Sequence, residues 1–544
     1  MAGHSPSKSK PRVAYYCMEY GLSPRFKIYS GGLGILAGDF LKAAHDARLP
    51  LVGIGILWQQ GYGEQRVSPQ GTVTPHFKTY RYNFLKNTGV TVRVQVRGQS
   101  VACKVWKCTA FGNAPLYLLD TNLPQNGTNA TITDRLYSGD SAHRIAQEIV
   151  LGQGGYLALR ALKIPVDVHH FNEGHALFAG IEILRRQLAT GKSFAQAVAA
   201  TRRQVVFTTH TPVPAGNEQH PLDVLAELGA LDGLTRKQAE SLGGNPFNMT
   251  AAALRLARAA NAVAELHGVV AGKMWKHLRR AAPIHPITNA VHVGTWVDPK
   301  ILTAATDKPA RLWHAHMVNK RALVRFIAKR TGTHLNPSRL LIGFSRRAAS
   351  YKRWDLVFGD RQRIAPLLRS GRLQFVFAGK AHPSDTGGRA MIERIIALSR
   401  EFPKAIAFIP NYDMVIGAAL TRGADVWLNS PRRPNEASGT SGMKAAMNGV
   451  LNFSTLDGWW PEACQHGVNG WQYGDGKEMN PPEKQDAYDQ RGLYRVLLDN
   501  VVPTYYDARP AWINMMRASI ASTRDQFDAE RMLDDYYRTL YTSR

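Results

Sequence analysis

The sequence predicts an α/β protein of at least two domains, in which buried strands alternate with helices. A chain of 544 residues is too long to fold around one hydrophobic core. In the second half, helical stretches separate four short apolar runs, at residues 340–344, 374–377, 405–409 and 424–428. That alternation is what a doubly wound parallel sheet requires. Near the start, a strand predicted at residues 12–17 leads to a glycine-rich loop and a helix, which indicates a second unit of the same kind.

The overall composition is that of an ordinary globular protein, with 44% hydrophobic and 20% charged residues. No apolar run approaches the roughly 18 residues that a membrane span needs. Residues 1–11 are polar and basic, and we expect a disordered leader rather than a secretory signal. The cysteines show neither metal-like spacing nor a disulfide framework, which favours a reducing cytoplasm. They are Cys17, Cys103, Cys108 and Cys464.

The net charge of +27 is the unusual property of the composition. Charge of this size is often found in proteins that bind nucleic acids or acidic surfaces. Here arginine doublets are scattered along the chain instead of forming one basic tail, and no nucleic-acid recognition motif accompanies them. We therefore expect a solvated basic surface, with some arginines lining a site for phosphate, and no nucleic-acid partner.

Three further segments indicate how the chain is organised. Alternating apolar residues at 90–119 predict antiparallel strands inserted beside the first sheet. Residues 137–152 predict a helix with a polar lead-in, and residues 221–282 predict a helical stretch. Residues 289–296 are the candidate hinge between the two domains.

The most informative stretch is the turn from an apolar strand at 424–428 into a helix at 443–447. Serine, threonine and glycine residues fill the helix start, whose unpaired backbone N–H groups attract an anion. Lys444 follows Thr440 by one helical turn and lies on the same face. A phosphate site beside a lysine amine suits pyridoxal phosphate, whose aldehyde condenses with lysine. Spacing alone favours a simpler interpretation, a capped helix with a solvated lysine.

Residues 436–444, Glu-Ala-Ser-Gly-Thr-Ser-Gly-Met-Lys, resemble the cofactor-lysine segment of the glycogen, starch and α-glucan phosphorylases. The match to Glu-Ala-Ser-Gly-Thr-x-x-Met-Lys holds at every fixed position, and it continues at 448–449 and 456–458. The segment Gly31-Gly-Leu-Gly34 is similar to the loop that meets the phosphate side of the active site in this family. Such a loop is a poor discriminator by itself, because glycogen synthases of the same fold also carry it.

Two histidine segments fit the same family. His170, Glu173 and His175 suggest a metal site at first, but their spacing is not that of His-Glu-x-x-His on a helix, and we expect no metal. The segment is similar to Asn-Asp-x-His-Pro, with His175 in the histidine position, although Glu173, Gly174 and Ala176 depart from the pattern. His210 falls on a family histidine whose backbone carbonyl faces the sugar.

Residues 289–296 resemble Thr-Asn-Gly followed by tryptophan, with Asn289 on the sugar-binding asparagine and Trp296 on the tryptophan. Ala290 replaces the glycine. Cations at the end of a strand facing an interdomain crevice can clamp an oxyanion. Residues 346–353 resemble the family motif Lys-Arg-x-x-x-Tyr-Lys-Arg, with Arg346 in place of lysine and Ala349-Ser350 in place of His-Glu. Tyr412 matches a tyrosine near the cofactor phosphate, whereas Asp413 replaces an arginine of the long phosphorylases.

The resemblance spans residues 15–541 and implies the GT-B glycosyltransferase fold, in which two Rossmann-like domains face a deep cleft. The predicted domains are a leader at 1–11, an N-terminal Rossmann-like domain at 12–289, a C-terminal cofactor-binding one at 290–515 and a helical segment at 516–544 that packs back on the first domain. The chain is similar to the compact microbial α-glucan phosphorylases. We therefore expect neither phosphorylation control nor nucleotide allostery, and we expect a homodimer in the cytoplasm.

The resemblance also implies an activity and a set of site residues. The expected reaction is reversible, configuration-retaining phosphorolysis of a terminal α-1,4-linked glucose, from an α-1,4-glucan or maltodextrin and inorganic phosphate to α-glucose 1-phosphate, with pyridoxal 5'-phosphate as cofactor. The expected catalytic residues are Arg347, Lys352, His210, Asn289 and Glu436. The expected cofactor-binding residues are Lys444, Thr440, Gly439, Gly32, Arg346, Tyr412 and Trp296. The expected substrate-binding residues are Leu33, His175, Ser438 and Gly439.

Two other functions stay open on the sequence. A nucleotide-sugar glycogen synthase of the same fold would share the loop at 31–34 and a glutamate in the second domain, but it has no use for the aldehyde-binding Lys444. A catalytically silent glucan-binding relative is the second alternative, because the motif departures at 349–350, 173–174 and 413 fall in the expected site.

Overall fold

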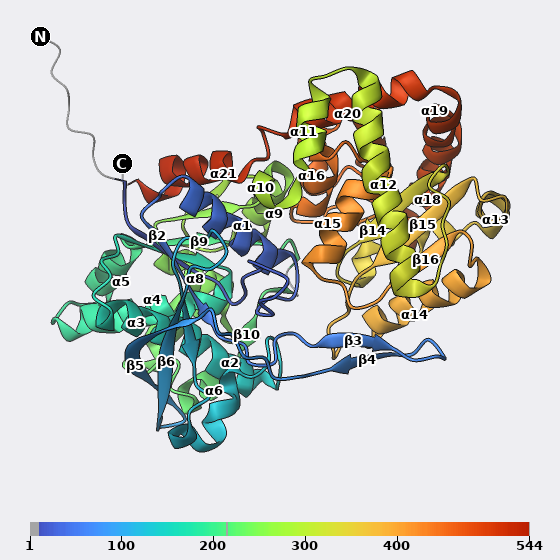
Figure 1. Ribbon diagram of the computed structural model, residues 1–544. Coiled ribbons are helices and arrows are strands. Elements are labelled where there is room, and N and C mark those ends of the chain that lie inside the picture. Colours follow the sequence, from blue (N-terminus) through green and yellow to red (C-terminus); the bar gives the residue numbers. More distant parts are fainter. Residues whose placement is uncertain (1–9, 214–215, 543–544) are drawn as a thin grey trace, which may run out of the picture.

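The computed structural model describes residues 10–213 and 216–542, which form two α/β bodies, each around a mainly parallel sheet (Figure 1). Most of the predicted leader, residues 1–9, lies outside the described residues. No helix in the described ranges combines the length and the apolar character needed to cross a lipid bilayer. The predicted α/β class with parallel sheets is confirmed.

The first sheet has the strand order β13-β12-β9-β8-β1-β2-β7-β6-β5. Its pairs are parallel except β5 with β6 and β6 with β7, so the antiparallel strands predicted at 90–119 are present at one edge. The strands are β1 (Val13–Tyr16), β2 (Leu51–Ile56), β5 (Lys86–Val96), β6 (Gln99–Cys108), β7 (Leu116–Asp120), β8 (Val168–Asn172), β9 (Val205–Thr208), β12 (Ala259–Ala262) and β13 (Ile284–Pro286).

The second sheet is parallel throughout, with the order β16-β15-β14-β17-β18-β19. The four strands predicted there are confirmed, whereas β18 and β19 were not predicted. The strands are β14 (Leu340–Ser345), β15 (Leu373–Ala378), β16 (Ile406–Ile409), β17 (Val426–Asn429), β18 (Leu451–Thr455) and β19 (Gly470–Tyr473).

Both sheets are doubly wound. Numbered along the chain, the parallel strands run 3-2-1-4-5-6-7 in the first sheet and 3-2-1-4-5-6 in the second, and the order reverses between β1 and β8 and between β14 and β17. Ligands of such sheets bind at the carboxyl ends of the strands beside these reversals. The topology therefore specifies where a site is expected in each body.

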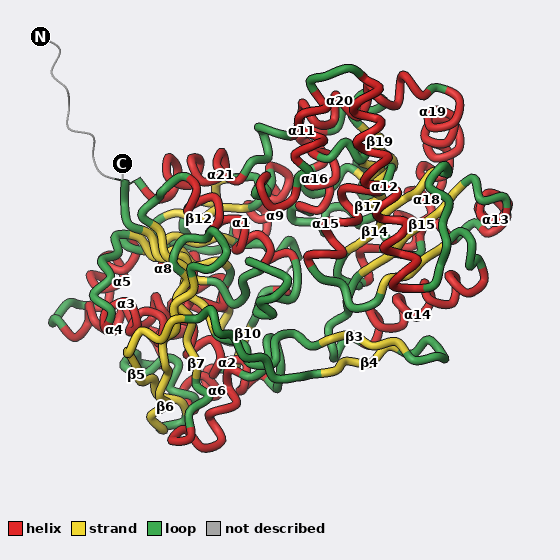
Figure 2. Tube along the Cα trace, viewed as in Figure 1, coloured by secondary structure: helices red, strands yellow, loops and turns green. Residues whose placement is uncertain are grey.

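Helices cover the two sheets (Figure 2). Those preceding residue 290 are α1 (Gly32–Asp46), α2 (Ser141–Ile149), α3 (Gly155–Ala161), α4 (Leu177–Ala189), α5 (Phe194–Arg202), α6 (Leu222–Glu227), α7 (Arg236–Gly243), α8 (Met249–Leu256) and α9 (Glu265–Trp275). Those that follow are α10 (Val293–Trp296), α11 (Pro299–Ala305), α12 (Pro309–Thr331), α13 (Arg361–Arg369), α14 (Thr386–Glu401), α15 (Met414–Gly423), α16 (Thr440–Met447), α17 (Trp460–Ala463), α18 (Pro482–Val496), α19 (Val502–Asp507), α20 (Arg509–Thr523) and α21 (Ala529–Tyr536).

The helical prediction for residues 221–282 was wrong in its middle, where β12 joins the first sheet. The strand sequence is Ala-Ala-Asn-Ala, and alanine is the strongest helix former. The strand is short and mostly buried, so it shows no alternation of apolar and polar residues. Pairing with β9 and β13 overrides the local preference.

A two-stranded hairpin, β3 (Glu64–Val67) and β4 (Val73–His76), reaches from the first body across to the second (Figure 1). The buried Gln65 side chain donates to the carbonyl of Gly379 (3.2 Å) and accepts from the amide of Ala381 (3.4 Å). At the hairpin tip, Arg400 donates to two backbone carbonyls. Val73 packs in the hydrophobic core of the second sheet. The hairpin is therefore part of both bodies.

The end of the chain crosses back to the first body. α20 packs with the second core through Met516 and Ile520, on the far side of the predicted boundary at 515. α21 packs with the first core, where the Tyr536 ring meets Phe40 of α1 edge-on at 5.5 Å. Between them, residues 527–529 pair with Val291 through two backbone hydrogen bonds of 3.0 Å. The exact domain limits stay a prediction.

A buried ion cluster fastens α12 to the second sheet. Asp425, which is fully buried, accepts hydrogen bonds from Lys320, from His316 (2.9 Å) and from the amide of Leu341 (2.7 Å). Burial alone would raise the pKa of Asp425, but Lys320 and His316 outweigh it and hold the pKa below its ordinary value.

Replacing Asp425 by alanine leaves Lys320 buried without its counter-charge. We expect Asp425→Ala to lower the free energy of unfolding by about 3–5 kcal/mol, because the buried charge of Lys320 is then no longer compensated. The measurement is the thermal unfolding midpoint. Asp307→Ala, which removes a surface pair with Arg311, is the control and should leave the midpoint nearly unchanged. Equal midpoints for the two variants would contradict this account.

Candidate active site

A cavity of about 920 Å³ lies at the carboxyl ends of both sets of strands. Residues that follow β1, β8, β9 and β13 line it from the first body, and residues that follow β14, β15, β16 and β17 line it from the second. The cavity brings together all the predicted site residues except Trp296. These are Gly32, Leu33, His175, His210, Asn289, Arg346, Arg347, Lys352, Tyr412, Glu436, Ser438, Gly439, Thr440 and Lys444. Their individual roles stay predictions.

The glycine loop opens α1, which begins at Gly32. Glu19 was not predicted as a site residue. Its carboxylate accepts from the amide of Gly31 (3.1 Å), from the Ser30 hydroxyl (3.0 Å) and from the Tyr137 hydroxyl (2.8 Å). A Cβ on Gly34 would lie 2.6 Å from Glu19, so a glycine is needed there for the close approach. The available signal was an acidic residue directly after an apolar strand.

The predicted cofactor lysine lies on α16 as expected. β17 leads to Gly439, whose φ of +90° suits glycine, and α16 starts at Thr440. Lys444 is buried, and its Nζ lies 3.5 Å from the centroid of the Trp296 ring. Burial lowers the pKa of Lys444 to about 8, although the Asp39 carboxylate opposes this shift. An amine with such a pKa is available in its neutral, nucleophilic form near pH 8.

Two buried cations follow β14 and share one carboxylate. Glu436 accepts from Lys352 Nζ (2.7 Å) and from Arg346 (2.8 Å). Burial, with Arg346 adding repulsion, lowers the pKa of Lys352 to about 7. Burial would raise the pKa of Glu436, but the two cations lower it to about 2. Behind them, Asp457 accepts the Glu436 amide (2.9 Å), and burial beside Glu436 raises the pKa of Asp457 to about 7.

The other two cations of this segment point in different directions. Arg347 is exposed and lines the cavity. Arg353 is buried, donates to the carbonyls of Ser430 and Pro431, each at 2.8 Å, and forms an ion pair with Asp489 (2.7 Å). Arg353 therefore holds the loop that leads to Glu436 and does not face the cavity.

The first body supplies polar groups on the opposite wall. His210 Nε2 lies 2.6 Å from the Asn172 side-chain oxygen, and the His210 amide donates to Glu173. The Glu173 carboxylate also accepts from Gly174 (3.3 Å) and Thr211 (3.2 Å), so the residue that departs from the family pattern anchors the histidine loop. Burial raises the pKa of Glu173 to about 7.

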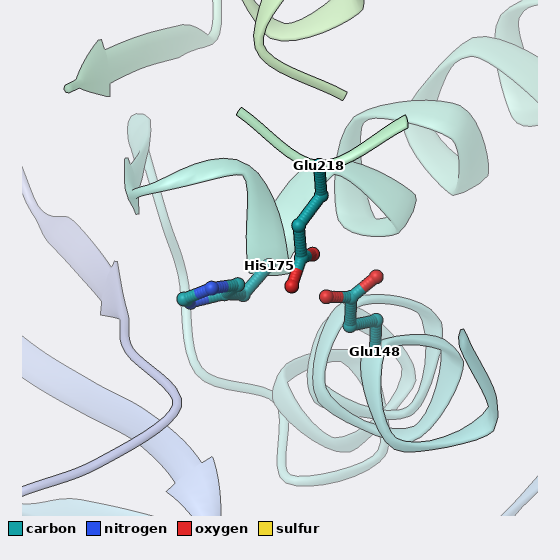
Figure 3. A group of neighbouring side chains, drawn as sticks. All are labelled: Glu148, His175 and Glu218. Carbon is teal, nitrogen blue, oxygen red and sulfur yellow. The ribbon is translucent and has the colours of Figure 1, made fainter. Parts of the chain in front are cut away.

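His175 does not meet the two residues with which its spacing suggested a metal site. His170 lies in the core, 2.6 Å from Tyr541 and Thr208. His175 instead joins Glu148 and Glu218, with ligand-type atoms of all three within 4.8 Å of one another (Figure 3).

Two carboxylates and an imidazole are a donor set that a divalent cation accepts. Arg144 already supplies a positive charge there, at 3.4 Å from Glu148 and 3.1 Å from Glu218. Burial, with repulsion from Glu218, raises the pKa of Glu148 well above its ordinary value, which favours one proton on this pair. We interpret the group as a charge-balanced polar wall of the cavity.

The cavity fits a phosphorylated ligand. Buried polar atoms that find no hydrogen-bond partner within the described residues include Arg346 Nε, Ser345 Oγ, Ser438 Oγ and Asn289 Oδ1, and all four residues line the cavity. Unsatisfied buried groups are rare in folded proteins and indicate a missing ligand or water. Lys380 adds another cation, whose pKa burial lowers to about 8. Lys380 was not among the predicted site residues.

The chain belongs to the carbohydrate phosphorylase family. The family model described as "Carbohydrate phosphorylase" matches residues 300–468, which include β14, the cation segment and Lys444. Relatives at 36–38% identity extend the match over nearly the whole chain. The two doubly wound sheets and the site between them agree with the fold expected from the sequence.

Three relatives illustrate the extent of this similarity. A maltodextrin phosphorylase of Thermococcus litoralis is 38% identical over 97% of this chain and 70% of its own length. A glycogen phosphorylase of Aquifex aeolicus is 36% identical over 98% of this chain and 86% of its own length. An uncharacterized protein of Methanocaldococcus jannaschii is 36% identical over 97% of this chain and 99% of its own length.

The geometry of the cation segment predicts opposite outcomes for Arg353 and Arg347. Arg353→Ala removes two buried hydrogen bonds and leaves Asp489 without its cation, so we expect a loss of about 3–5 kcal/mol of stability. Arg347→Ala removes an exposed cation and should leave the unfolding midpoint nearly unchanged while weakening the retention of inorganic phosphate. Thermal unfolding and phosphate binding, measured on both variants, check this. Equal loss of stability in both would refute the assignment.

Proposed function

We propose that this protein is an α-glucan phosphorylase. It transfers a terminal α-1,4-linked glucose from a glucan or maltodextrin to inorganic phosphate, giving α-glucose 1-phosphate with retention of configuration, and the reaction is reversible. The observation that carries the proposal is Lys444, which stands in an unbroken family motif and opens with lowered pKa into a cavity lined by buried cations. The names of the relatives support the same class of substrate.

Pyridoxal 5'-phosphate is the cofactor that this cavity suits. Bound through its aldehyde at Lys444, it supplies a phosphate group that gives and takes a proton near neutral pH. Arg346, Thr440 and the glycines at 32 and 439 are proposed to hold that phosphate. The unpaired Arg346 Nε and the amides at the start of α16 are the groups that favour an anion there.

Lys352 and Arg347 are proposed to hold the substrate phosphate. Glu436 forms ion pairs with both Lys352 and Arg346. A phosphate dianion entering beside them offers a stronger acceptor, so Glu436 becomes available to a sugar hydroxyl. Both cations also stabilise the charge arrangement as the bond between C1 and the leaving oxygen breaks and C1 bonds to phosphate.

The opposite wall is proposed to hold the glucose. The buried Asn289 Oδ1 has no partner within the described residues and can accept from a sugar hydroxyl. His210, fixed by Asn172 and Glu173, presents its backbone carbonyl. Leu33, Ser438 and Gly439 complete the contacts, and His175 lies further along the wall, where the glucan chain would pass.

The proposed covalent link at Lys444 can be tested directly. After borohydride reduction and digestion, mass spectrometry should find a phosphopyridoxyl group on Lys444. Lys404, exposed in the same body, is the internal control and should remain unmodified. A clean Lys444 in protein supplied with pyridoxal phosphate would remove this mechanism and leave a nucleotide-sugar transferase or a glucan-binding protein.

The second prediction separates catalysis from cofactor binding. Lys352→Ala should lower kcat for phosphorolysis by about 10³-fold or more, since it removes a preorganised cation from the reacting phosphate. The phosphopyridoxyl group on Lys444 should still form at the wild-type level. Lys404→Ala is the matched control with wild-type kcat. Turnover retained in Lys352→Ala would exclude Lys352 from this role.

A further inference from the structure

One buried acid next to the cofactor lysine has no part in the function proposed above. Asp39 of α1 is 1% exposed, and both of its carboxylate oxygens lie 2.9 Å from Nε1 of Trp296. Trp296 is the predicted site residue that does not line the cavity, and its ring lies under the amine of Lys444. The three side chains form a chain of contacts, in which the Asp39 carboxylate meets the edge of the indole and the Lys444 amine lies over its face.

Hydrogen bonds to the backbone carbonyl of Trp296 help to hold this residue in place. Arg422 and Asn448 both donate to the carbonyl of Trp296, at 2.9 Å and 3.2 Å. Asn448 also donates to the carbonyl of Lys444 (2.8 Å). One side chain therefore sets the position of the tryptophan relative to the lysine, and the 3.5 Å spacing of the amine from the ring follows from the fold.

These contacts favour a positive charge on the Lys444 amine. A cation over an indole face is attracted by the ring, and the attraction grows when the site is desolvated. The N–H group of Trp296 donates to a carboxylate, which draws positive charge to the ring edge and leaves the face more negative. The negative charge of Asp39 also attracts the Lys444 ammonium directly.

Two other charged groups affect the charges of Lys444 and Asp39. Lys42, one turn beyond Asp39 on α1, is held by Thr295 (2.8 Å) and disfavours a second positive charge at Lys444. His292 faces Asp39 and favours its ionised form, but its ring is paired with Asp46 (2.8 Å). Of the groups that act on Lys444, Asp39 is therefore the one that favours its charged form.

We propose that Asp39 is a positioning residue that acts through Trp296 to hold Lys444 and to stabilise a positive charge on its nitrogen. The inference rests on the proposed function for the use of that lysine, but the charge itself is a property of the protein without cofactor. Asp39 does not touch the ligand cavity, so it acts only through its two neighbours.

The test measures the titration of Lys444 in cofactor-free protein. The protein is labelled briefly with an amine-acylating reagent at a series of pH values, and mass spectrometry gives the labelled fraction of the Lys444 peptide. Asp39→Asn keeps the size of the side chain and removes the charge. Its labelling midpoint should fall by about one pH unit, because a nearby opposite charge shifts a pKa by one unit or more.

The control variant is Asp46→Asn, which removes an exposed carboxylate from the same helix and should leave the Lys444 midpoint unchanged. Circular dichroism establishes that each variant is folded. Folded Asp39→Asn with the wild-type midpoint would overturn the proposal and leave Asp39 a purely structural residue.

If Asp39→Asn does not fold, Trp296→Phe decides the question. It keeps a ring under Lys444 but removes the N–H link and weakens the attraction of the ring for a cation. The midpoint should fall here too, and an unchanged midpoint would overturn the proposal. A failed search for phosphopyridoxyl-Lys444 would refute the proposed function without affecting the midpoint shift, so the two failures are distinguishable.

Discussion

The structure of the site depends on the burial of two cations side by side at the end of β14. Lys352 and Arg346 repel one another in a region that water does not screen, and each loses hydration. Glu436 offsets this cost by accepting from both. Behind Glu436, burial together with repulsion from the Glu436 carboxylate raises the pKa of Asp457. Glu436 is therefore the group that keeps the two cations together at the wall of the cavity.

The two sheets place complementary chemistry on facing walls. Because both are wound in the same order, each presents its strand ends to the same cavity. The second body contributes cations and Lys444, while the first contributes neutral amides, histidines with lowered pKa and carboxylates that hold loops. A phosphate and a sugar can therefore be held at once, each by the wall whose groups suit it.

Much of this arrangement could be predicted from the sequence. Lys444, Lys352 and Asn289 were found because they stand in motifs, and the parallel strands were found because fully buried strands are continuous apolar runs. β12 was missed because its alanines favour a helix locally. Glu19 was missed because it stands in no motif and its contact with Tyr137 joins distant segments, and the meeting of Glu148 with Glu218 also joins distant segments. Such contacts exist only in the folded chain.

The hairpin β3–β4 reaches the second body at one place, and Val291 pairs with residues 527–529 at another. Other hydrogen bonds also join the two bodies, among them those that Glu462 accepts from Thr288 (2.7 Å) and from the amide of Glu265 (2.9 Å). Gln65 is hydrogen-bonded to Gly379 and Ala381, and Lys380, which lies between them, lines the cavity. Lys380 also donates to the carbonyl of Gly63 (3.1 Å), so the position of this cation in the cavity depends on residues of both bodies.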